Sequence, residues 1–308
     1  MRVFVAGGTG AVGRALVPAL ITAGHQVTAS TRTPDKTARL RALGAEPVVA
    51  DGLDRAAVIA AVKTAAPDVI VHEMTALSAL TSFRNFDAQF AVTNELRTKG
   101  TDYLLEAAAA ADVRRVVAQG YTGWPNQRSG GPVKTEDDPV DGGVPDTERS
   151  LAAIRYVEER VPAGVPEGLV LRYGSFYGPG ASEFLLDQVR KRRVPVLGGG
   201  TGIWSFTEIT DAAAATVVAV ERGAPGVYNV VDDEPAPVAE WLPYLARVAG
   251  AKPPLRLPAW LGRLLAGELA VVQMTTVRGS SNAKAKRDLG WTPRYASWRE
   301  GFRAWASA

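Results

Sequence analysis

A glycine-rich segment near the N-terminus has the residue types and spacing of a phosphate-binding turn. The stretch Gly7-Gly8-Thr9-Gly10-Ala11-Val12-Gly13 follows a short apolar run and precedes a segment with apolar residues at helical spacing. Glycines in this pattern allow a tight turn, close approach of the backbone to a diphosphate, and close packing of a helix on a strand. The first N–H groups of the helix then face the phosphates. The segment predicts a dinucleotide-binding turn.

The end of the second apolar run indicates which dinucleotide is bound. It reads Ser30-Thr31-Arg32, and no Asp or Glu follows before Asp35. An NAD-selective site places an acid here for the ribose 2′-hydroxyl. Arg32 instead offers a guanidinium to a 2′-phosphate, with Ser30 and Thr31 as further donors. The alternative is that Arg32 is a solvated surface charge. We therefore predict NADP(H) in preference to NAD(H).

The elements that position these residues follow from an alternation of short apolar runs and Ala-rich amphipathic segments. We predict strands at 2–6, 26–30, 47–50, 68–72, 114–119 and 168–173, and helices at 12–23, 36–43, 54–65, 86–111 and 147–161. This order predicts an α/β fold with a Rossmann-type doubly wound parallel sheet. Residues 120–145 are rich in Gly, Pro and Asp and predict a long loop over a cleft. We assign residues 1–173 to a nucleotide-binding domain and 174–308 to a smaller substrate-binding region, part of which returns to the first domain.

Composition excludes several classes of site. The 308-residue chain has no cysteine and two histidines, which excludes thiol catalysis and thiolate metal centres, and we predict no metal. Its 35 basic and 32 acidic residues nearly cancel, so we expect no nucleic-acid partner. There is no signal peptide pattern and no apolar stretch long enough to cross a bilayer, so we expect a cytoplasmic protein that does not bind a membrane.

Taken together, these motifs resemble the extended short-chain dehydrogenase/reductase superfamily, in its NAD-dependent epimerase/dehydratase group. Other segments are similar to that family in the same order. They are Asp51-Gly52-Leu53-Asp54, Val71-His72-Glu73-Met74-Thr75-Ala76, Asn94 as the family's structural Asn, Arg172-Tyr173-Gly174 with the residues up to Gly180, and Leu289-Gly290-Trp291-Thr292-Pro293. The resemblance implies that Asp51, Gly52, Leu53, Met74, Thr75 and Tyr173 also contact the cofactor. Relatives often form dimers, so the resemblance also implies a possible homodimer.

The catalytic pair of that superfamily, Tyr followed four residues later by Lys, does not occur in this chain. Ser150 and Ile154 occupy the corresponding positions on the helix. Tyr156 and Arg160 have a similar spacing, but they fall about six residues late, so we interpret that match as accidental. Tyr121 and Thr122, at the end of the fifth strand, are our candidates for catalysis. Tyr121 could supply the missing phenol and Thr122 could bind a substrate oxygen; the alternative is that Tyr121 only packs in the site.

Aromatic residues suggest a small, partly apolar substrate. We predict that Trp124, Tyr177, Trp204 and Arg278 line its pocket. Tyr177 is either a hydrogen-bond donor or part of the pocket wall, and a structural role is the alternative for Arg278. The leading hypothesis is an NADP(H)-dependent oxidoreductase that transfers hydride to or from a carbonyl or alcohol carbon. The second is an epimerase or dehydratase that uses the cofactor transiently, and the third is a non-catalytic NADP sensor.

Overall fold

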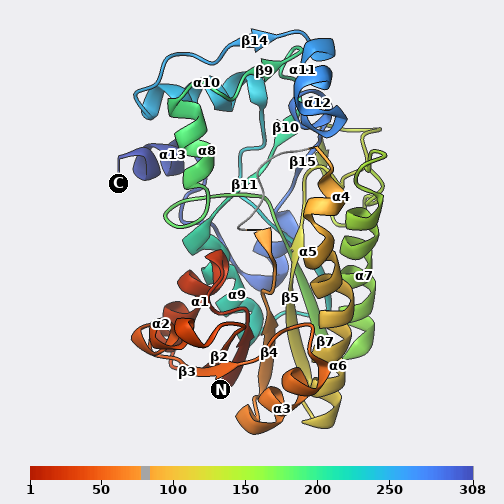
Figure 1. The fold of residues 1–308 in the computed structure, drawn as a ribbon, viewed down its shortest axis with the longest axis vertical. Helices are drawn as coiled ribbons and strands as arrows, with labels where there is room; N and C mark the ends of the chain where they lie inside the picture. The colour runs from red at the N-terminus through yellow and green to blue at the C-terminus, as the bar shows by residue number, and fades with distance from the viewer. Residues whose placement is uncertain (78–83, 308) are drawn as a thin grey trace.

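A parallel sheet of seven strands forms the centre of the protein (Figure 1). The structure is a computed structural model that describes residues 1–77 and 84–307. The strands are β1 (Arg2–Ala6), β2 (Gln26–Thr31), β3 (Glu46–Val49), β4 (Val69–His72), β5 (Arg115–Tyr121), β7 (Glu167–Tyr173) and β12 (Gly226–Val230). They are ordered β12-β7-β5-β4-β1-β2-β3, and all neighbours are parallel. In the sheet, β2 and β3 thus lie on one side of β1 and β4 lies on the other. Sheets of this kind bind ligands at the point where the strand order reverses in this way.

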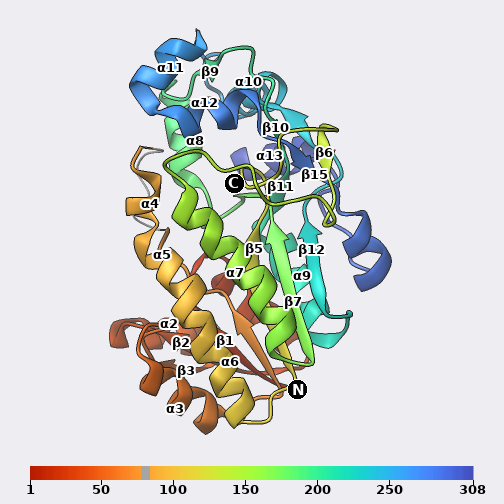
Figure 2. The same cartoon turned by 90° about the vertical axis from the view of Figure 1, so that its right-hand side faces the viewer.

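Helices cover both faces of this sheet, as the alternating pattern predicts. On one face, α1 (Ala11–Thr22) and α9 (Ile209–Glu221) bury an apolar cluster against the strands, and η1 (Pro34–Lys36) and α2 (Thr37–Ala42) lie beside β3. On the other face lie α3 (Arg55–Ala65), α6 (Thr101–Ala110) and α7 (Glu148–Gly164), as Figure 2 shows. Burial of apolar surface on both faces is what stabilises a parallel sheet.

The segment expected to be one helix over 86–111 is built from four consecutive parts. These are α4 (Phe86–Gln89), α5 (Ala91–Glu95), a π-helical turn η3 (Leu96–Gly100) and α6. A π turn adds a residue to the helical repeat and thus rotates the side chains that follow. Leu96 and Arg97, the first two residues of this turn, are buried. The prediction of a continuous regular helix was wrong at this turn.

The later part of the chain forms a second core above the sheet. Its helices are α8 (Glu183–Arg190), α10 (Val238–Val248), α11 (Ala259–Ala266), α12 (Glu268–Thr275) and α13 (Trp298–Ala306). Short strands pair in twos: β8 (Ser175–Tyr177) with β11 (Phe206–Glu208), β9 (Val196–Leu197) with β14 (Arg256–Leu257), and β10 (Ile203–Trp204) with β13 (Ala236–Pro237). Buried aromatic rings fill this core. Three elements beyond residue 173, namely α9, β12 and the π turn η4 (Ala285–Leu289), instead pack in the first region.

The long loop after β5 is held against the C-terminal part of the chain. β6 (Val133–Lys134) pairs with β15 (Gly279–Ser280), and the side-chain amide of Asn126 donates to the carbonyl of Arg278 at 3.1 Å and to Ser280 Oγ at 2.9 Å. The loop therefore joins the two regions of the protein. In the described ranges, none of the helices combines the length and apolar character needed to span a membrane.

Candidate functional site

The glycine turn between β1 and α1 leaves the N-terminus of the helix without a side-chain cap among the described residues. Gly10 precedes the helix and contributes no side-chain cap, while its own N–H donates to the carbonyl of Gly7 at 3.0 Å. Gly7 has φ +93°, and a Cβ atom there would lie 2.8 Å from the carbonyl oxygen of Glu73. A Cβ at Gly13 would lie 2.6 Å from the carbonyl oxygen of Gly7. Side chains are thus excluded from the turn, and the exposed helix N-terminus can bind a diphosphate.

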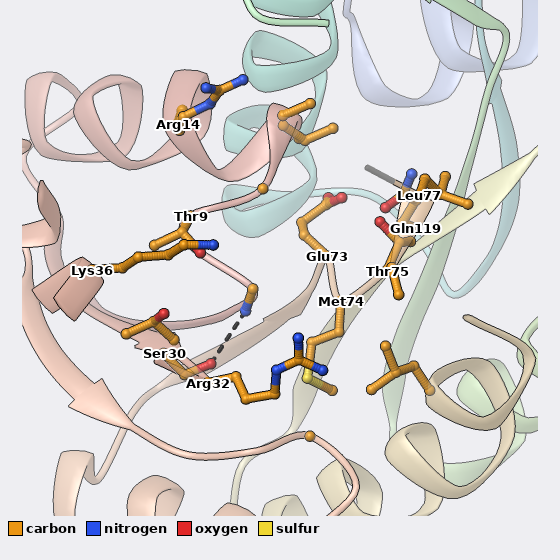
Figure 3. A pocket seen from close by; sticks show the side chains of 18 of the residues that line it. Thr9, Arg14, Ser30, Arg32, Lys36, Glu73, Met74, Thr75, Leu77 and Gln119 are labelled. Atoms are coloured by element: carbon orange, nitrogen blue, oxygen red, sulfur yellow. Dashed lines mark hydrogen bonds between the residues drawn. The ribbon is translucent and has the colours of Figure 1, made fainter. Parts of the chain in front are cut away.

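This turn borders a cavity of about 560 Å³ at the carboxyl ends of the strands (Figure 3). Its wall contains every residue predicted to bind the cofactor except Gly13 and Tyr173, namely Gly7, Thr9, Gly10, Ala11, Val12, Ser30, Thr31, Arg32, Asp51, Gly52, Leu53, Met74 and Thr75. Gly13 packs behind the turn, and Tyr173 is fully buried below the cavity. The sequence motifs, which are far apart along the chain, thus converge on one cavity.

One end of the cavity carries positive charge. Lys36 and Arg39, which the sequence analysis missed, line the wall together with Arg32. Figure 3 shows Ser30, Arg32 and Lys36 on the opposite side of the cavity from Glu73, Thr75 and Gln119. Ser30 Oγ accepts a hydrogen bond from the Gly7 N–H at 3.2 Å, so its own hydrogen is still available to a ligand. The spacing of Lys36 and Arg39, one helical turn apart, could have indicated this pair.

A buried acid forms part of the wall near the glycine turn. Glu73, directly after β4, is 4% exposed, and its Oε1 lies 3.2 Å from the Tyr173 hydroxyl. Burial raises the pKa of Glu73 to about 8, opposed by the Tyr173 hydrogen bond. On the preceding residue, burial lowers the pKa of His72 to about 4. Glu73 lies in the segment Val71–Ala76 that resembles the family, but no role follows from that resemblance; an acid at the end of an apolar strand was the available signal.

Tyr121 and Thr122, the candidates for catalysis, lie near the cavity but outside its wall. The Thr122 hydroxyl is buried and already bonded to Asn126 at 3.1 Å and Ser280 at 2.5 Å. Burial raises the pKa of Tyr121, while hydrogen bonds to Ser175 and Gln273 lower it. Gln119, two residues earlier on β5, lines the cavity itself. Thr122 is thus engaged in joining the loop to β15, whereas Tyr121 lies between the two regions of the protein.

A buried cation lies close to Tyr121. Arg97, on the π turn η3, is 5% exposed, and burial lowers its pKa to about 10. Its charge favours the ionised form of Tyr121. Next to it, Glu158 on α7 makes a bidentate ion pair with Arg172 at 2.6 and 2.7 Å. Sequence reasoning did not identify Arg97, because nothing in a helical pattern marks where a π turn rotates a side chain inward.

The four residues predicted to bind substrate do not line the cavity. Trp124 packs edge-on against Phe86, with ring centroids 5.5 Å apart. Trp204 packs on Trp241, and its indole N–H donates to the carbonyl of Gln273 at 2.7 Å. Tyr177 is buried in the second aromatic core, and Arg278 Nε donates to the carbonyl of Arg128. Each of these side chains is thus engaged in contacts elsewhere in the described part of the chain.

The helix positions that correspond to the superfamily's catalytic pair make hydrogen bonds and packing contacts within the fold. Ser150 is buried and donates to Asp87 at 2.6 Å, while Asn94 donates to Ser150 at 3.0 Å. Ile154 belongs to an apolar cluster. Tyr156 donates to Asp102 at 2.7 Å, and Arg160 also bonds that residue. The interpretation of the Tyr156 and Arg160 spacing as accidental agrees with these contacts, which lie on α6 and α7.

The arrangement suits a dinucleotide. The free N–H groups of α1 fit a diphosphate, the cations beside Arg32 fit a further phosphate, and Asp51 with Leu53 borders the end nearest β3. Gln119 and Thr75 add polar groups at the opposite end. No group of three or more His, Cys, Asp or Glu side chains able to hold a metal occurs within residues 1–77 and 84–307.

Sequence comparisons give related proteins over the whole chain. The model of the NAD dependent epimerase/dehydratase family matches residues 3–230. A 3-diazoavenalumate denitrifying reductase from a Streptomyces species is 44% identical over 308 residues, which cover 98% of this chain and 99% of the relative. A 2-alkyl-3-oxoalkanoate reductase from Stenotrophomonas maltophilia is 30% identical over 338 residues, with 98% of both chains covered.

Solved structures share the fold. A Thermus thermophilus UDP-glucose 4-epimerase in complex with NAD superposes with a TM-score of 0.76 at 22% identity, covering 100% of this chain and 98% of the other. A human epimerase family protein with NADPH gives a TM-score of 0.75 at 20% identity, covering 100% and 99%. At these identities the likeness concerns the architecture, and it agrees with the doubly wound sheet predicted from the sequence.

Proposed function

The chain belongs to the NAD dependent epimerase/dehydratase family, and from this premise we propose that it is an NADPH-dependent reductase that delivers hydride to a small, electrophilic aromatic compound. Membership confirms the resemblance inferred from the sequence. The named relatives are reductases, so the chain is an NAD(P)-dependent oxidoreductase or epimerase of the short-chain dehydrogenase/reductase superfamily. The preference for NADPH, the reaction and the substrate are the content of the proposal.

The observation that supports NADPH is the group of three cations at one end of the cavity. Arg32, Lys36 and Arg39 line that end, and Arg32 makes no hydrogen bond or ion pair within the described residues. A free guanidinium is suited to bind a phosphate through two parallel hydrogen bonds. The nearest lining acid along the chain is Asp51, whose Oδ1 accepts from the Leu53 N–H at 3.0 Å. A 2′-phosphate fits this end better than a free ribose hydroxyl.

The missing Tyr and Lys pair favours a hydride acceptor that needs no proton. Bound NADPH supplies a hydride, and hydride reduction of a carbonyl leaves an alkoxide that must be protonated. An aryl diazonium ion is already a cation: hydride forms a C–H bond at the ring carbon, the C–N bond breaks, and its electron pair leaves with dinitrogen. Charge balances without a proton from the protein. The relative with 44% identity is named for loss of nitrogen from a diazo compound, which supports this substrate class.

Carbonyl reduction is the second candidate, because a relative with 30% identity is named as an oxoalkanoate reductase. In that reaction Tyr121 would donate a hydrogen bond to the substrate oxygen. Its raised pKa suits a neutral donor better than a base at neutral pH. Thr122 is a weaker candidate for contacting substrate, because its hydroxyl already contacts Asn126 and Ser280.

The test is hydride transfer with labelled cofactor. NADPH carrying deuterium on one face of C4 is incubated with a carboxylate-bearing benzenediazonium salt, and in parallel with a matched aryl ketone. We expect deuterium on the ring carbon that lost nitrogen, from one C4 epimer only, because an enzyme site presents one face of the nicotinamide. Heat-denatured protein measures the uncatalysed background. Stereospecific label in the alcohol alone would establish carbonyl reduction instead, and label in neither product would refute the proposed reaction.

A further inference from the structure

The Glu73 side chain forms a hydrogen-bond chain that is short of one hydrogen. Glu73 Oε1 lies 3.2 Å from the Tyr173 hydroxyl, which lies 2.6 Å from Thr216 Oγ1. Thr216 Oγ1 in turn lies 2.8 Å from the carbonyl oxygen of Ala212 on α9, an atom that can only accept. The three contacts contain two hydroxyl hydrogens. All three are hydrogen bonds only when Glu73 contributes a hydrogen of its own.

The surroundings of Glu73 favour the neutral acid. Its Oε2 is buried and has no hydrogen-bond partner in the described structure, although the residue lines the cofactor cavity. An ionised carboxylate at this position would lose its hydrating water molecules and gain only the hydrogen bond with Tyr173, which makes the charged form unfavourable. Burial raises the pKa of Glu73 to about 8, with Tyr173 as the one opposing influence.

Few charged groups face this carboxyl. Tyr173 lies on β7, and α9 contributes the neutral Thr216. On α1, Arg14 also lines the cavity, but its guanidinium donates to the carbonyl of Gly180 at 2.5 Å. Figure 3 shows Arg32 and Lys36 across the cavity from Glu73.

We propose that Glu73 is a positioning residue that is held as a neutral, protonated carboxylic acid. The cavity then binds the diphosphate of its nicotinamide cofactor only when Glu73 carries this proton. The inference rests on the proposed function in taking a dinucleotide as the ligand. The glycine turn that would hold the diphosphate is adjacent, because a Cβ at Gly7 would contact the Glu73 backbone. Loss of the proton places an unscreened negative charge beside the negative diphosphate. Above the point of ionisation, cofactor binding must therefore take up one proton.

The size of the effect follows from the fraction of protein that carries the proton. With a pKa of about 8, this fraction falls about tenfold between pH 7 and pH 9, and the apparent Kd for NADPH rises by the same factor of about ten. His72 does not titrate in this range.

Calorimetric titration with NADPH at pH 7 and pH 9, in buffers of different ionisation enthalpy, measures both affinity and proton uptake. We expect uptake approaching one proton at pH 9 and near zero at pH 7. Glu73→Gln keeps the size of the side chain and supplies an N–H donor to Tyr173, so its affinity should match the wild type at pH 7 and lose the tenfold dependence. Asp51→Asn is the matched control, because it removes another lining carboxyl and should leave the ratio between the two pH values unchanged.

Infrared difference spectra of the cofactor-free protein separate this inference from the proposed function. Wild type minus Glu73→Gln should show the carbonyl band of a protonated carboxyl at pH 7, fading as pH rises through 8. Absence of that band at pH 7 overturns the inference even where NADPH binds tightly. A band together with pH-independent affinity and no proton uptake overturns the coupling to the diphosphate. Failure of NADPH to bind at all refutes the proposed function and the coupling, while the band still decides the protonation state.

Discussion

Replacing Arg32 by alanine should weaken NADPH binding and leave NADH binding nearly unchanged. Arg32 is exposed at the end of β2, lines the cavity, and has no competing partner in the described residues. A hydrogen bond between a guanidinium and a phosphate contributes about 1.5–3 kcal/mol, and solvent exposure favours the lower value. A loss of about 1.5 kcal/mol corresponds to roughly a tenfold weaker Kd for NADPH. NADH has no 2′-phosphate, so its Kd should change less than about twofold.

The assay is calorimetric titration of both cofactors against the wild type, Arg32→Ala and Arg41→Ala. Arg41 is an exposed arginine on α2 that does not line the cavity, so it controls for loss of one positive charge from this surface. We expect Arg41→Ala to bind both cofactors as the wild type does. Equal weakening of NADPH and NADH by Arg32→Ala would refute a specific phosphate contact. Tighter binding of NADH than of NADPH by the wild type would refute the selectivity altogether.

Four further predictions concern the reaction and the fold. Tyr121→Phe should lower turnover of a carbonyl substrate about 100-fold and leave diazonium turnover nearly unchanged, because only carbonyl reduction needs a hydrogen-bond donor to the substrate oxygen. Steady-state rates on both substrates test this, and equal effects on the two rates would contradict it. Gly13→Ala forces a Cβ to 2.6 Å from the Gly7 carbonyl oxygen, so NADPH affinity should fall at least about tenfold and unfolding free energy by about 1–3 kcal/mol. Gly131→Ala, whose Cβ would make an ordinary contact of 3.9 Å with the Val133 carbonyl oxygen, should change neither. Glu158→Gln leaves the buried Arg172 unpaired and should lower the urea-unfolding free energy by about 3–5 kcal/mol, against less than about 1 kcal/mol for the exposed Glu268→Gln. The folded-state pKa of Glu73, about 8, lies above its usual 4.5, so the folded protein keeps a proton that the unfolded chain loses. The unfolding free energy of the wild type should therefore fall as pH rises from about 4.5 to 8, by about 5 kcal/mol at 1.36 kcal/mol per pH unit. Urea unfolding of Glu73→Gln should lack this pH-dependent component.

The cofactor half of the site could be predicted from the sequence because its determinants are local. The glycine turn needs small residues within seven positions, and the stretch from Gly7 to Gly13 has them. Each of the other motifs ends or follows a predicted strand, and parallel strands bring their carboxyl ends to one edge. The alternation of apolar runs therefore sufficed to predict the doubly wound sheet, while the family resemblance pointed to Asp51 and Met74, which line the same cavity as Ser30.

The surroundings of the residues predicted to contact substrate depend on contacts between distant segments. Tyr177 looks like a pocket residue beside its motif, yet the packing of α13 encloses it with Phe302 and Trp305. Thr122 follows a strand as a ligand-binding residue would, but β15 supplies Ser280 as its partner 158 residues away. A single sequence carries no periodic signal for such pairings, so residue type alone could not separate wall from pocket.

The sequence by itself thus determined the sheet, the glycine turn, the cationic Arg32 and the absence of a Tyr and Lys pair. Only the tertiary structure decided the surroundings of Glu73 and Arg97. Their side chains are ordinary charges in the sequence, and the folded protein encloses both. The reason is that propensity and spacing act over a few residues, whereas desolvation depends on everything that the complete fold packs around a group.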